Sequence, residues 1–337
     1  MNTIEGREEP EQETVIGMVV PAAILDAHRD MLRVTSELDA FKAFAITAET
    51  ALEKAAGTPG NSLERVIHRE FYNTPAAGTI KYDTDAPPTK AMAEQALRDV
   101  GDCIERLKEV KGVAVDEGRV ENSKGADSKS TKSLEQVRFR VGGYEPAAMR
   151  MEGRDGRVYL NIRPASAAVA VSGLIDILQA LQVKAQVKLT YGVSQRTLNR
   201  IDRLVLYFEE GDEKKAVQAV ENFYREQSNI FDDTGSPRFT APLKNTEGTL
   251  MTGVSFGEEP DHTVVGADSF GGVRSKILAD VCAQAGRQRV YDPKFDIHSA
   301  FISACKRSTI AVDSSHPAFN SRRAQDKPSF EFIRSRL

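Results

Sequence analysis

The sequence predicts an α+β protein in which a helical N-terminal region precedes a core of strands and helices. Apolar residues recur at helical spacing through the first third of the chain, whereas several segments beyond residue 135 alternate apolar and polar residues with the period of a strand. The second half follows the order strand, helix, strand, strand, helix, which is typical of the α+β class.

The composition of the 337-residue chain argues against several functions. Its 45 lysines and arginines against 49 aspartates and glutamates give a net charge of −4, unlike a general nucleic-acid or polybasic membrane binder. No apolar run approaches the roughly 20 residues of a membrane-spanning helix. Cys103, Cys282 and Cys305 lack the spacing of a disulfide framework or zinc site. We therefore expect free thiols and neither nucleic acid nor a membrane as partner.

The first third of the chain is predicted to be an acidic arm followed by helices. The first fourteen residues contain five glutamates and no apolar period, so we expect a flexible arm over residues 1–20 and no secretory signal peptide. Residues 21–117 are predicted to be helical. The clearest helix covers residues 89–107, where apolar side chains mark one stripe and Thr89 is the expected N-cap.

The rest of the chain is predicted to be a linker, a core and a basic tail. Residues 118–135 are rich in Ser, Lys and Gly, as in a linker or mobile loop, and residues 321–337 form the tail. The core covers residues 136–320 and includes a turn-rich, irregular stretch over 232–266. Its predicted strands are 158–163, 183–190 and 204–208; its predicted helices are 166–181, 213–227, one that begins at Ser269, and one around Phe301.

Familiar catalytic motifs are absent from the sequence. It contains no phosphate-binding P-loop, no dinucleotide fingerprint, no nucleophile elbow and no zinc-protease motif. The five histidines are scattered, and no group of acids or cysteines has metal-ligand spacing. We therefore expect neither a metal nor another cofactor.

The strongest chemical signal is a set of cations in the second half. Lys184 and Lys188 lie on the polar face of one predicted strand, Arg163 lies on that of another, and Arg200 precedes the third. Positive charge beside a partly buried lysine lowers its pKa toward neutrality, where the amine can act as a general base, and arginines bind phosphate with two hydrogen bonds.

A second anion-binding element is the expected helix start at Ser269. Small residues there leave backbone N–H groups for an anion, and Arg274 adds charge in the second turn. Each element also has an ordinary structural interpretation. Alternating lysines commonly form a solvated strand face, Arg200 and Asp202 could form a surface ion pair, and Tyr159 could simply pack in the core. From the residues alone, both interpretations remain open.

Several segments of the second half resemble the HopA-type type III effector family, whose relatives include lyases of class V lanthipeptide and thioamitide biosynthesis. The similarity covers about residues 60–320. The segments that carry it are Gly156-Arg-Val-Tyr-Leu-Asn-Ile-Arg-Pro164, Val187-Lys188, Arg200-Ile-Asp-Arg-Leu-Val-Leu-Tyr207, Gly253-Val-Ser-Phe-Gly-Glu-Glu-Pro260, Ser269-Phe-Gly-Gly-Val-Arg274, Ala311-Val-Asp-Ser-Ser-His-Pro-Ala-Phe-Asn320 and, nearer the N-terminus, Glu64-Arg-Val-Ile-His-Arg-Glu-Phe-Tyr72.

The resemblance implies a core like that of the effector phosphothreonine lyases, with a mostly antiparallel sheet flanked by helices. It implies β-elimination of phosphate from a phosphorylated peptide, giving dehydrobutyrine or dehydroalanine, without a cofactor. The implied roles are as follows: Lys188 as base with Lys184 as the alternative, Arg200, Arg274, Ser269 and Arg163 as phosphate-binding residues, Asp202 as the group that orients them, and Tyr159 as a candidate acid. The phosphothreonine lyases carry a histidine acid on the first strand, whereas this chain has Tyr159 and Asn161 there.

The resemblance also leaves alternatives in another class. The chain could be a non-catalytic effector that binds host immune proteins after type III secretion, or a phosphopeptide-binding module. Effector secretion signals tend to be Ser-rich and poor in acids, unlike the acidic N-terminus here. We therefore expect a lyase of the bacterial cytoplasm that matures a peptide natural product together with a partner peptide kinase.

Overall fold

The computed structural model describes residues 81–120, 134–146, 156–237, 240–258 and 270–289, with isolated positions elsewhere that include His68, Tyr72 and Arg336. Within these residues, seven strands form one antiparallel sheet in the order β1-β2-β4-β5-β3-β7-β6. The strands are β1 (Val113–Val120), β2 (Leu134–Val141), β3 (Gly156–Leu160), β4 (Ala185–Tyr191), β5 (Leu204–Phe208), β6 (Ala241–Lys244) and β7 (Leu250–Glu258). A short pair, β8 (Ile310–Ala311) with β9 (Phe319–Asn320), stands apart from this sheet.

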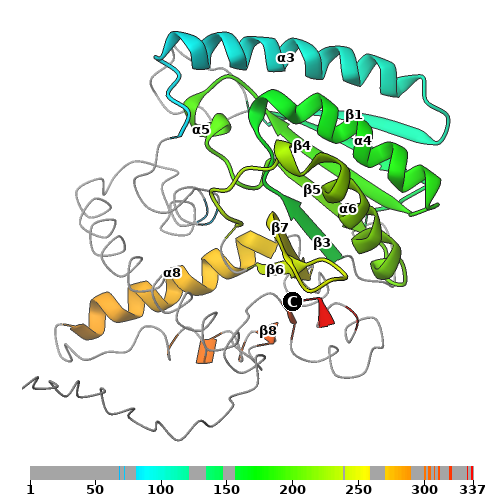
Figure 1. The fold of residues 1–337 in the computed structure, drawn as a ribbon. Helices are drawn as coiled ribbons and strands as arrows, with labels where there is room; N and C mark the ends of the chain where they lie inside the picture. The colour runs from blue at the N-terminus through cyan, green and yellow to red at the C-terminus, as the bar shows by residue number, and fades with distance from the viewer. Residues whose placement is uncertain are drawn as a thin grey trace, which may run out of the picture.

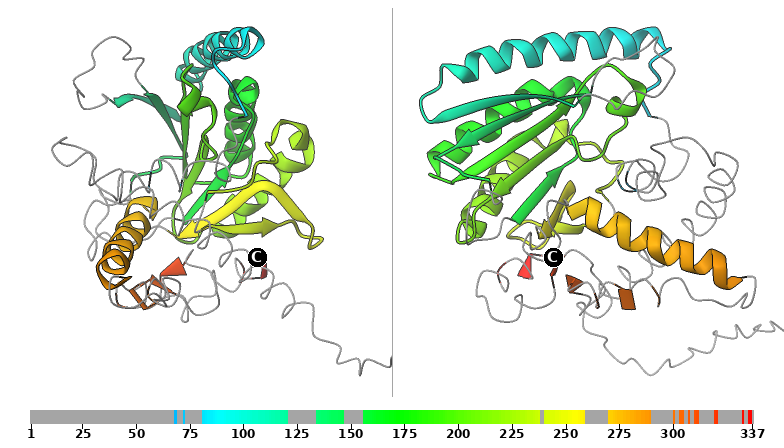
Figure 2. Two further views of the ribbon diagram at one scale, coloured as in Figure 1. Left: turned by 90° about the vertical axis from the view of Figure 1, so that its left-hand side faces the viewer. Right: turned by 180° about the vertical axis from the view of Figure 1, so that it is seen from behind.

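Helices cover the two faces of the sheet unequally. Figures 1 and 2 show α4 and α6 side by side on one face and α8 on the other, with α3 along the edge near α4. The helices are α3 (Pro87–Lys108), α4 (Ala167–Ala180), α5 (Gln195–Leu198), α6 (Glu213–Gln227) and α8 (Phe270–Arg289), with 3-10 turns η3 (Pro164–Ser166) and η4 (Ser228–Ile230). No helix in the described part of the chain is both long and apolar enough to span a membrane.

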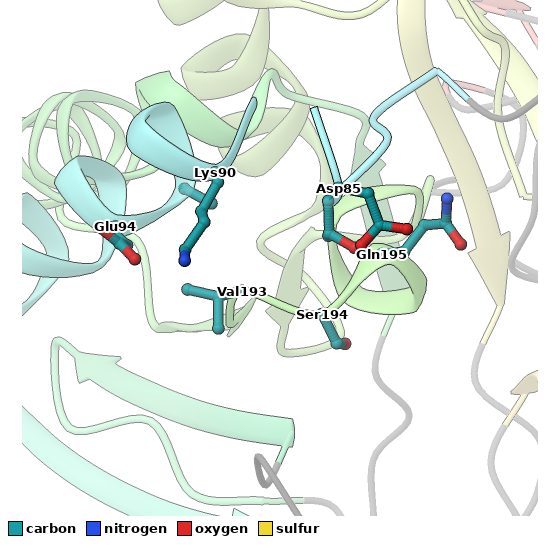
Figure 3. A pocket seen from close by; sticks show the side chains of 8 residues that line it. Asp85, Lys90, Glu94, Val193, Ser194 and Gln195 are labelled. Carbon is teal, nitrogen blue, oxygen red and sulfur yellow. The ribbon is translucent and has the colours of Figure 1, made fainter. Parts of the chain in front are cut away.

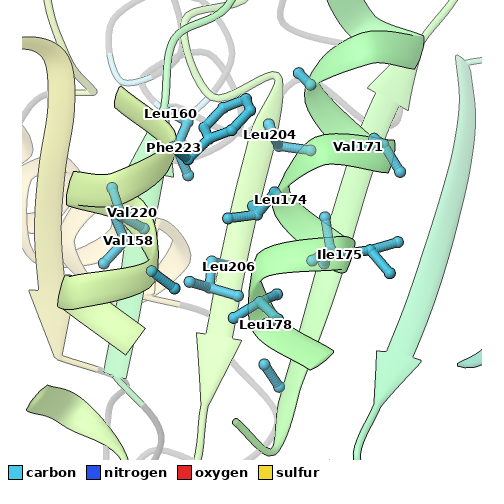
Figure 4. Close-up of a cluster of buried hydrophobic side chains, with 14 of the residues drawn as sticks. Val158, Leu160, Val171, Leu174, Ile175, Leu178, Leu204, Leu206, Val220 and Phe223 are labelled. Atoms are coloured by element: carbon cyan, nitrogen blue, oxygen red, sulfur yellow. The ribbon is translucent and has the colours of Figure 1, made fainter. Parts of the chain in front are cut away.

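The main core lies between the sheet and helices α3, α4 and α6. In β3, β4 and β5 every second side chain points into it, as the apolar period of these segments predicts. Figure 4 shows Val158 and Leu160 of β3 with Leu204 and Leu206 of β5 against the apolar stripes of α4 and α6. Burial of these apolar side chains on one face leaves the opposite face of the same strands for other chemistry.

The structure confirms the α+β class and most of the central elements. Strand β5 and helix α6 have the predicted bounds. Helix α4 and strand β4 each begin and end within two residues of the predicted 166–181 and 183–190. Helix α8 begins at Phe270, directly after Ser269 as expected. Within the expected helix around Phe301, the described positions Ala300, Ser303, Ala304 and Arg307 are helical. The acidic arm and the side chains of the cysteines other than Cys103 lie outside the described part of the chain. Cys103 is a buried free thiol.

The N-terminal side of the core differs from the prediction. Residues 113–120 form strand β1, where helix and then linker were expected, and β1 pairs with β2 from Val113 opposite Val141 to Val120 opposite Leu134. Gly112, with φ +84°, makes the turn that separates β1 from α3. The predicted linker at 118–135 therefore joins two paired strands. Helix α3 is also part of the core, because Val100, Cys103, Ile104 and Leu107 pack in it.

Two smaller predictions were also wrong. Helix α3 begins after Ala86, so Thr89 lies inside its first turn rather than at the cap; Pro87 occupies the start, where a proline costs no hydrogen bond. The stretch 232–266 contains β6 and β7, whose alternation is interrupted by Gly253 at φ +76°. In the tail, Arg336 binds the buried carboxylate of Glu221 and the backbone of Lys244, so this residue is anchored.

Candidate functional site

The sheet face opposite α4 and α6 carries a concentration of positive charge. Strand alternation places Arg138 of β2, Lys188 of β4, Tyr207 of β5 and Arg157 of β3 on this face, while their chain neighbours enter the main core. The register sets Arg138 opposite Lys188, and Tyr207 opposite Arg157. We call this group, together with Arg200, the basic face.

Arg138 and Lys188 form a cross-strand pair of like charges. Such a pair is destabilising in a sheet unless an anion neutralises it. Among the residues that the structure describes, no carboxylate pairs with either side chain, and Lys188 Nζ makes no hydrogen bond. Arg140, two residues along β2, instead binds Asp116 of β1 with Nε to Oδ2 at 3.0 Å. Asp116 also lies directly opposite Arg138 in the β1–β2 register, so this one carboxylate faces both arginines of β2, whereas Lys188 lies between Arg138 and Val205 with no carboxylate opposite it.

Arg200 and Asp202 form a bidentate ion pair beside this face. Arg200 Nε donates to Asp202 Oδ1 at 2.7 Å and Arg200 Nη2 donates to Oδ2 at 2.6 Å. The side chains are 11% and 6% exposed. Burial opposes ionisation of Asp202, but the charge and hydrogen bonds of Arg200, with the charge of Lys188, outweigh it and hold the carboxyl pKa below its usual range. Asp202 therefore fixes the guanidinium, and Nη1 makes no hydrogen bond within the described residues.

The segment that carries Arg200 is anchored by Arg203. This buried guanidinium donates to the backbone oxygens of Thr197 and Leu198 in α5 and of Ile162 after β3. Burial lowers its pKa to about 10, although Tyr82 and Asp202 oppose that shift. Arg203, three residues after Arg200, thus serves the backbone rather than a ligand.

Tyr207 lies between the cations of the basic face. Its ring centroid is 4.7 Å from Arg157 Cζ. Burial raises the pKa of the phenol, but the nearby charges of Arg157, Lys188 and Arg138 more than offset that effect, so the pKa lies below its usual range. The side chain is half-buried, and no hydrogen bond to its hydroxyl is present within the described part of the structure.

Tyr159 is part of an aromatic wall beside the basic face. It is 1% exposed, and its ring packs 6.0 Å from that of Phe270 at the start of α8. The Tyr72 hydroxyl lies 2.9 Å from the Tyr159 hydroxyl, and Arg157 Nη1 donates to the latter at 3.5 Å. Burial raises the pKa of both phenols. Tyr159 is therefore protonated at neutral pH, and other side chains already engage its hydroxyl.

His68 also reaches this region from the segment that resembles the family's N-terminal helix. Its ring centroid lies 5.3 Å from that of Tyr72. Burial and the charges of Arg200, Lys188 and Arg196 lower its pKa to about 4, against an opposing effect of Asp202. The imidazole is neutral at pH 7, and no alternation in the sequence indicated that it would lie near the Arg200–Asp202 pair.

The remaining predicted site residues have the following positions. Arg274 is fully buried over the ring of Phe270, 3.6 Å from its centroid, and Nη1 donates to the Phe270 carbonyl at 3.3 Å. Arg163 is exposed and follows the end of β3. Lys184 is exposed before β4, with Nζ 3.8 Å from Glu209. Ser269 lies outside the described residues. The structure therefore brings together Lys188, Arg200, Asp202 and Tyr159.

Sequence reasoning missed Arg138, Arg157, Tyr207 and His68. The sequence pattern could have indicated Arg138, because Arg138 and Arg140 alternate with the apolar Val137, Phe139 and Val141, as in a strand with one polar face. Arg157 and Tyr207 lie on the polar faces of strands that the pattern did predict. His68 had no such signal, since only the tertiary fold brings it to the sheet.

A separate hollow of about 510 Å³ lies between the start of α3 and the loop after β4. Figure 3 shows Lys90 between Glu94 and Val193, with Asp85 near Ser194 and Gln195. Its charged side chains are of both signs, and it includes none of the basic-face residues. No group of His, Cys, Asp and Glu within the described residues has the arrangement of a metal site.

The fold and site define an antiparallel α+β protein with one sheet face buried under helices and the other lined by cations. The model of the HopA1 effector protein family matches residues 133–319, more than half of the chain, and the chain belongs to that family. No match was found among the curated proteins.

Two solved structures align with most of this chain. The effector protein from Pseudomonas syringae pv. tomato strain DC3000 is 15% identical, with 86% of this chain and 99% of that chain covered and a TM-score of 0.51. The effector protein from Pseudomonas syringae pv. syringae strain 61 is also 15% identical, and the alignment covers 84% of this chain and 98% of that chain with a TM-score of 0.46. At this identity the likeness to the first shows the fold alone.

Proposed function

We propose that this protein is a phosphothreonine or phosphoserine lyase that acts on a phosphorylated peptide. One observation carries the proposal: Lys188 has no hydrogen-bond or ion-pair partner within the described residues, although it lies among arginines on a half-covered sheet face. A lyase site must bind the phosphate and remove a proton from the peptide. The arginines can bind the phosphate, and the unpaired Lys188 amine can remove the proton.

The proposed reaction is a β-elimination. Lys188 Nζ takes the α-proton of the phosphorylated residue. The electron pair of that C–H bond forms the Cα–Cβ double bond, and the Cβ–O bond breaks as phosphate departs. The products are dehydrobutyrine from threonine or dehydroalanine from serine, with the proton on Lys188.

The arginines of the basic face are the proposed phosphate ligands. Arg138 lies opposite Lys188, Arg157 lies across Tyr207, and Arg200 presents the side that Asp202 leaves available. Fixed guanidinium groups lower the barrier because charge on the departing phosphate grows in the transition state. Of the ligands expected from sequence, Arg274 instead supports the Phe270 side of the aromatic wall.

The biological setting that we propose is maturation of a precursor peptide in the bacterial cytoplasm. β-Elimination consumes a phosphorylated residue, so a reaction that transfers phosphate to the peptide hydroxyl must come first. A peptide kinase is therefore the proposed partner.

Incubation of the protein with a phosphothreonine peptide, followed by mass spectrometry, tests the proposal. The expected result is loss of the mass of one phosphoric acid from the peptide. Lys188→Ala should abolish this loss while phosphopeptide binding persists. Lys184→Ala is the matched control, because that exposed lysine precedes the same strand but pairs with Glu209; it should retain activity.

The same assay separates the proposal from its alternatives. Binding of the phosphopeptide by wild-type protein without any mass loss would identify a phosphopeptide-binding module. Absence of both binding and mass loss would instead favour a non-catalytic effector that binds host proteins.

A further inference from the structure

Three tyrosines meet at the basic face, and their hydroxyls differ in availability. Tyr72 and Tyr159 engage each other at 2.9 Å, and Arg157 also contacts Tyr159. Both are almost completely buried. Tyr207 is half-buried, and its hydroxyl makes no hydrogen bond within the described part of the chain. Of these three, only Tyr207 can offer its hydroxyl to a ligand without breaking a contact.

Tyr207 is also placed beside the proposed base. On β4, Lys188 lies opposite Val205, and Gln186 lies opposite Tyr207. Lys188 and Tyr207 are therefore diagonal neighbours on one face, a separation that long and aromatic side chains can span. On its other side Tyr207 lies opposite Arg157 of β3. A phosphate bound by Arg138, Arg157 and Arg200 would thus lie next to the Tyr207 hydroxyl and the Lys188 amine.

We propose that Tyr207 is the proton donor to the departing phosphate, an inference that rests on the elimination proposed above. Lys188 removes the α-proton and the Cβ–O bond breaks. The Tyr207 hydroxyl gives its proton to the oxygen that leaves carbon, so hydrogen phosphate departs and a tyrosinate remains. The proton held by the Lys188 ammonium then returns to the tyrosinate through water, which restores both groups.

The surroundings of Tyr207 suit a donor. Arg157, Lys188 and Arg138, from β3, β4 and β2, lower its pKa against burial and the charge of Asp202, and they stabilise the tyrosinate that the step produces. Proton donors are most effective when their pKa lies near the working pH. Tyr159, whose pKa is raised by burial, is the poorer candidate of the two.

The test compares Tyr207→Phe with Tyr159→Phe in the elimination assay over a range of pH. Tyr207→Phe should lower kcat by about 100-fold with little change in KM, as loss of one proton donor does. The alkaline decline of the wild-type kcat profile, where the donor loses its proton, should disappear with it. Tyr159→Phe should keep that decline and lose much less activity.

Each outcome bears on one of the two proposals. Wild-type protein without elimination would overturn the lyase function and, with it, the role of Tyr207. Active wild-type protein with an equally active Tyr207→Phe variant, or a variant that keeps the alkaline decline, would overturn the donor alone. If Tyr207→Phe does not fold, tyrosinate absorbance of the wild type must titrate at the pH of the alkaline decline, and a clear mismatch overturns the assignment.

Discussion

Single residues of the basic face are held by charge rather than by apolar packing. Asp202 is ionised although it is buried, because two hydrogen bonds and the charge of Arg200 outweigh the cost of leaving water. The pair therefore has consequences for stability as well as for the site: removal of one member leaves the other buried and uncompensated.

Asp202→Asn should destabilise the fold by about 3 kcal/mol at neutral pH, since the buried guanidinium of Arg200 loses its counter-charge. The folded-state pKa of Asp202 is lower than the unfolded one, so its contribution is fully present above the unfolded value and is lost as pH falls through the folded value. Urea unfolding from pH 7 down to acid should show a shallower decline in the variant. An unchanged slope would contradict the ion-pair argument.

At the scale of elements, α8 is held against β7 by a close approach at Gly257. A Cβ at this position would lie 2.7 Å from the ring of Phe270, the first residue of α8. Phe270 in turn packs on Tyr159 and Tyr72, so the helix start, the strand and the aromatic wall form one unit. Space for a methyl group exists only if the buried Phe270 ring or the helix that carries it moves.

Gly257→Ala should therefore cost about 2 kcal/mol through overpacking and should displace the wall beside the basic face. Gly101→Ala is the matched control, because nothing lies within 4 Å of its Cβ and it is an exposed position inside α3. That substitution should stabilise by about 0.5–1 kcal/mol through helix propensity. Urea unfolding of the two variants checks both signs, and equal effects would refute the contact.

The elements also show what a sequence can and cannot predict. The apolar period locates α4, β4, β5 and α6, because each buries one regular face. It fails at β1, where Val113 and Val115 alternate too briefly after a long helix, and at β7, where Gly253 breaks the period. It finds Lys188 and Arg200, which lie on or next to predicted strands. The apolar period cannot predict that Arg138 lies opposite Lys188, because the pairing of β2 with β4 depends on the tertiary fold.

At the scale of the whole molecule, residues outside the matched family region are attached to the site. Asn199 Oδ1 accepts from the backbone N–H groups of Lys81 and Tyr82 at 2.9 and 3.0 Å, and its Nδ2 donates to the Tyr82 carbonyl. Lys81 Nζ and the Tyr82 hydroxyl also bind the buried Asp232. The segment before α3 is thus fixed to the loop that directly precedes Arg200.

Asn199→Ala should loosen this connection. It removes three hydrogen bonds to residues 81–82; water can replace the exposed one to the Lys81 N–H, whereas the two part-buried bonds to Tyr82 are lost, at a cost of about 1–3 kcal/mol. Because Arg200 is the next residue, affinity for a phosphothreonine peptide should fall as well, as titration calorimetry would show. Asp233→Ala is the control: its carboxylate is 85% exposed and pairs with Lys81 at the surface, so stability and affinity should both change little. If Asn199→Ala lowers stability but leaves affinity intact, the attachment supports the fold without positioning Arg200.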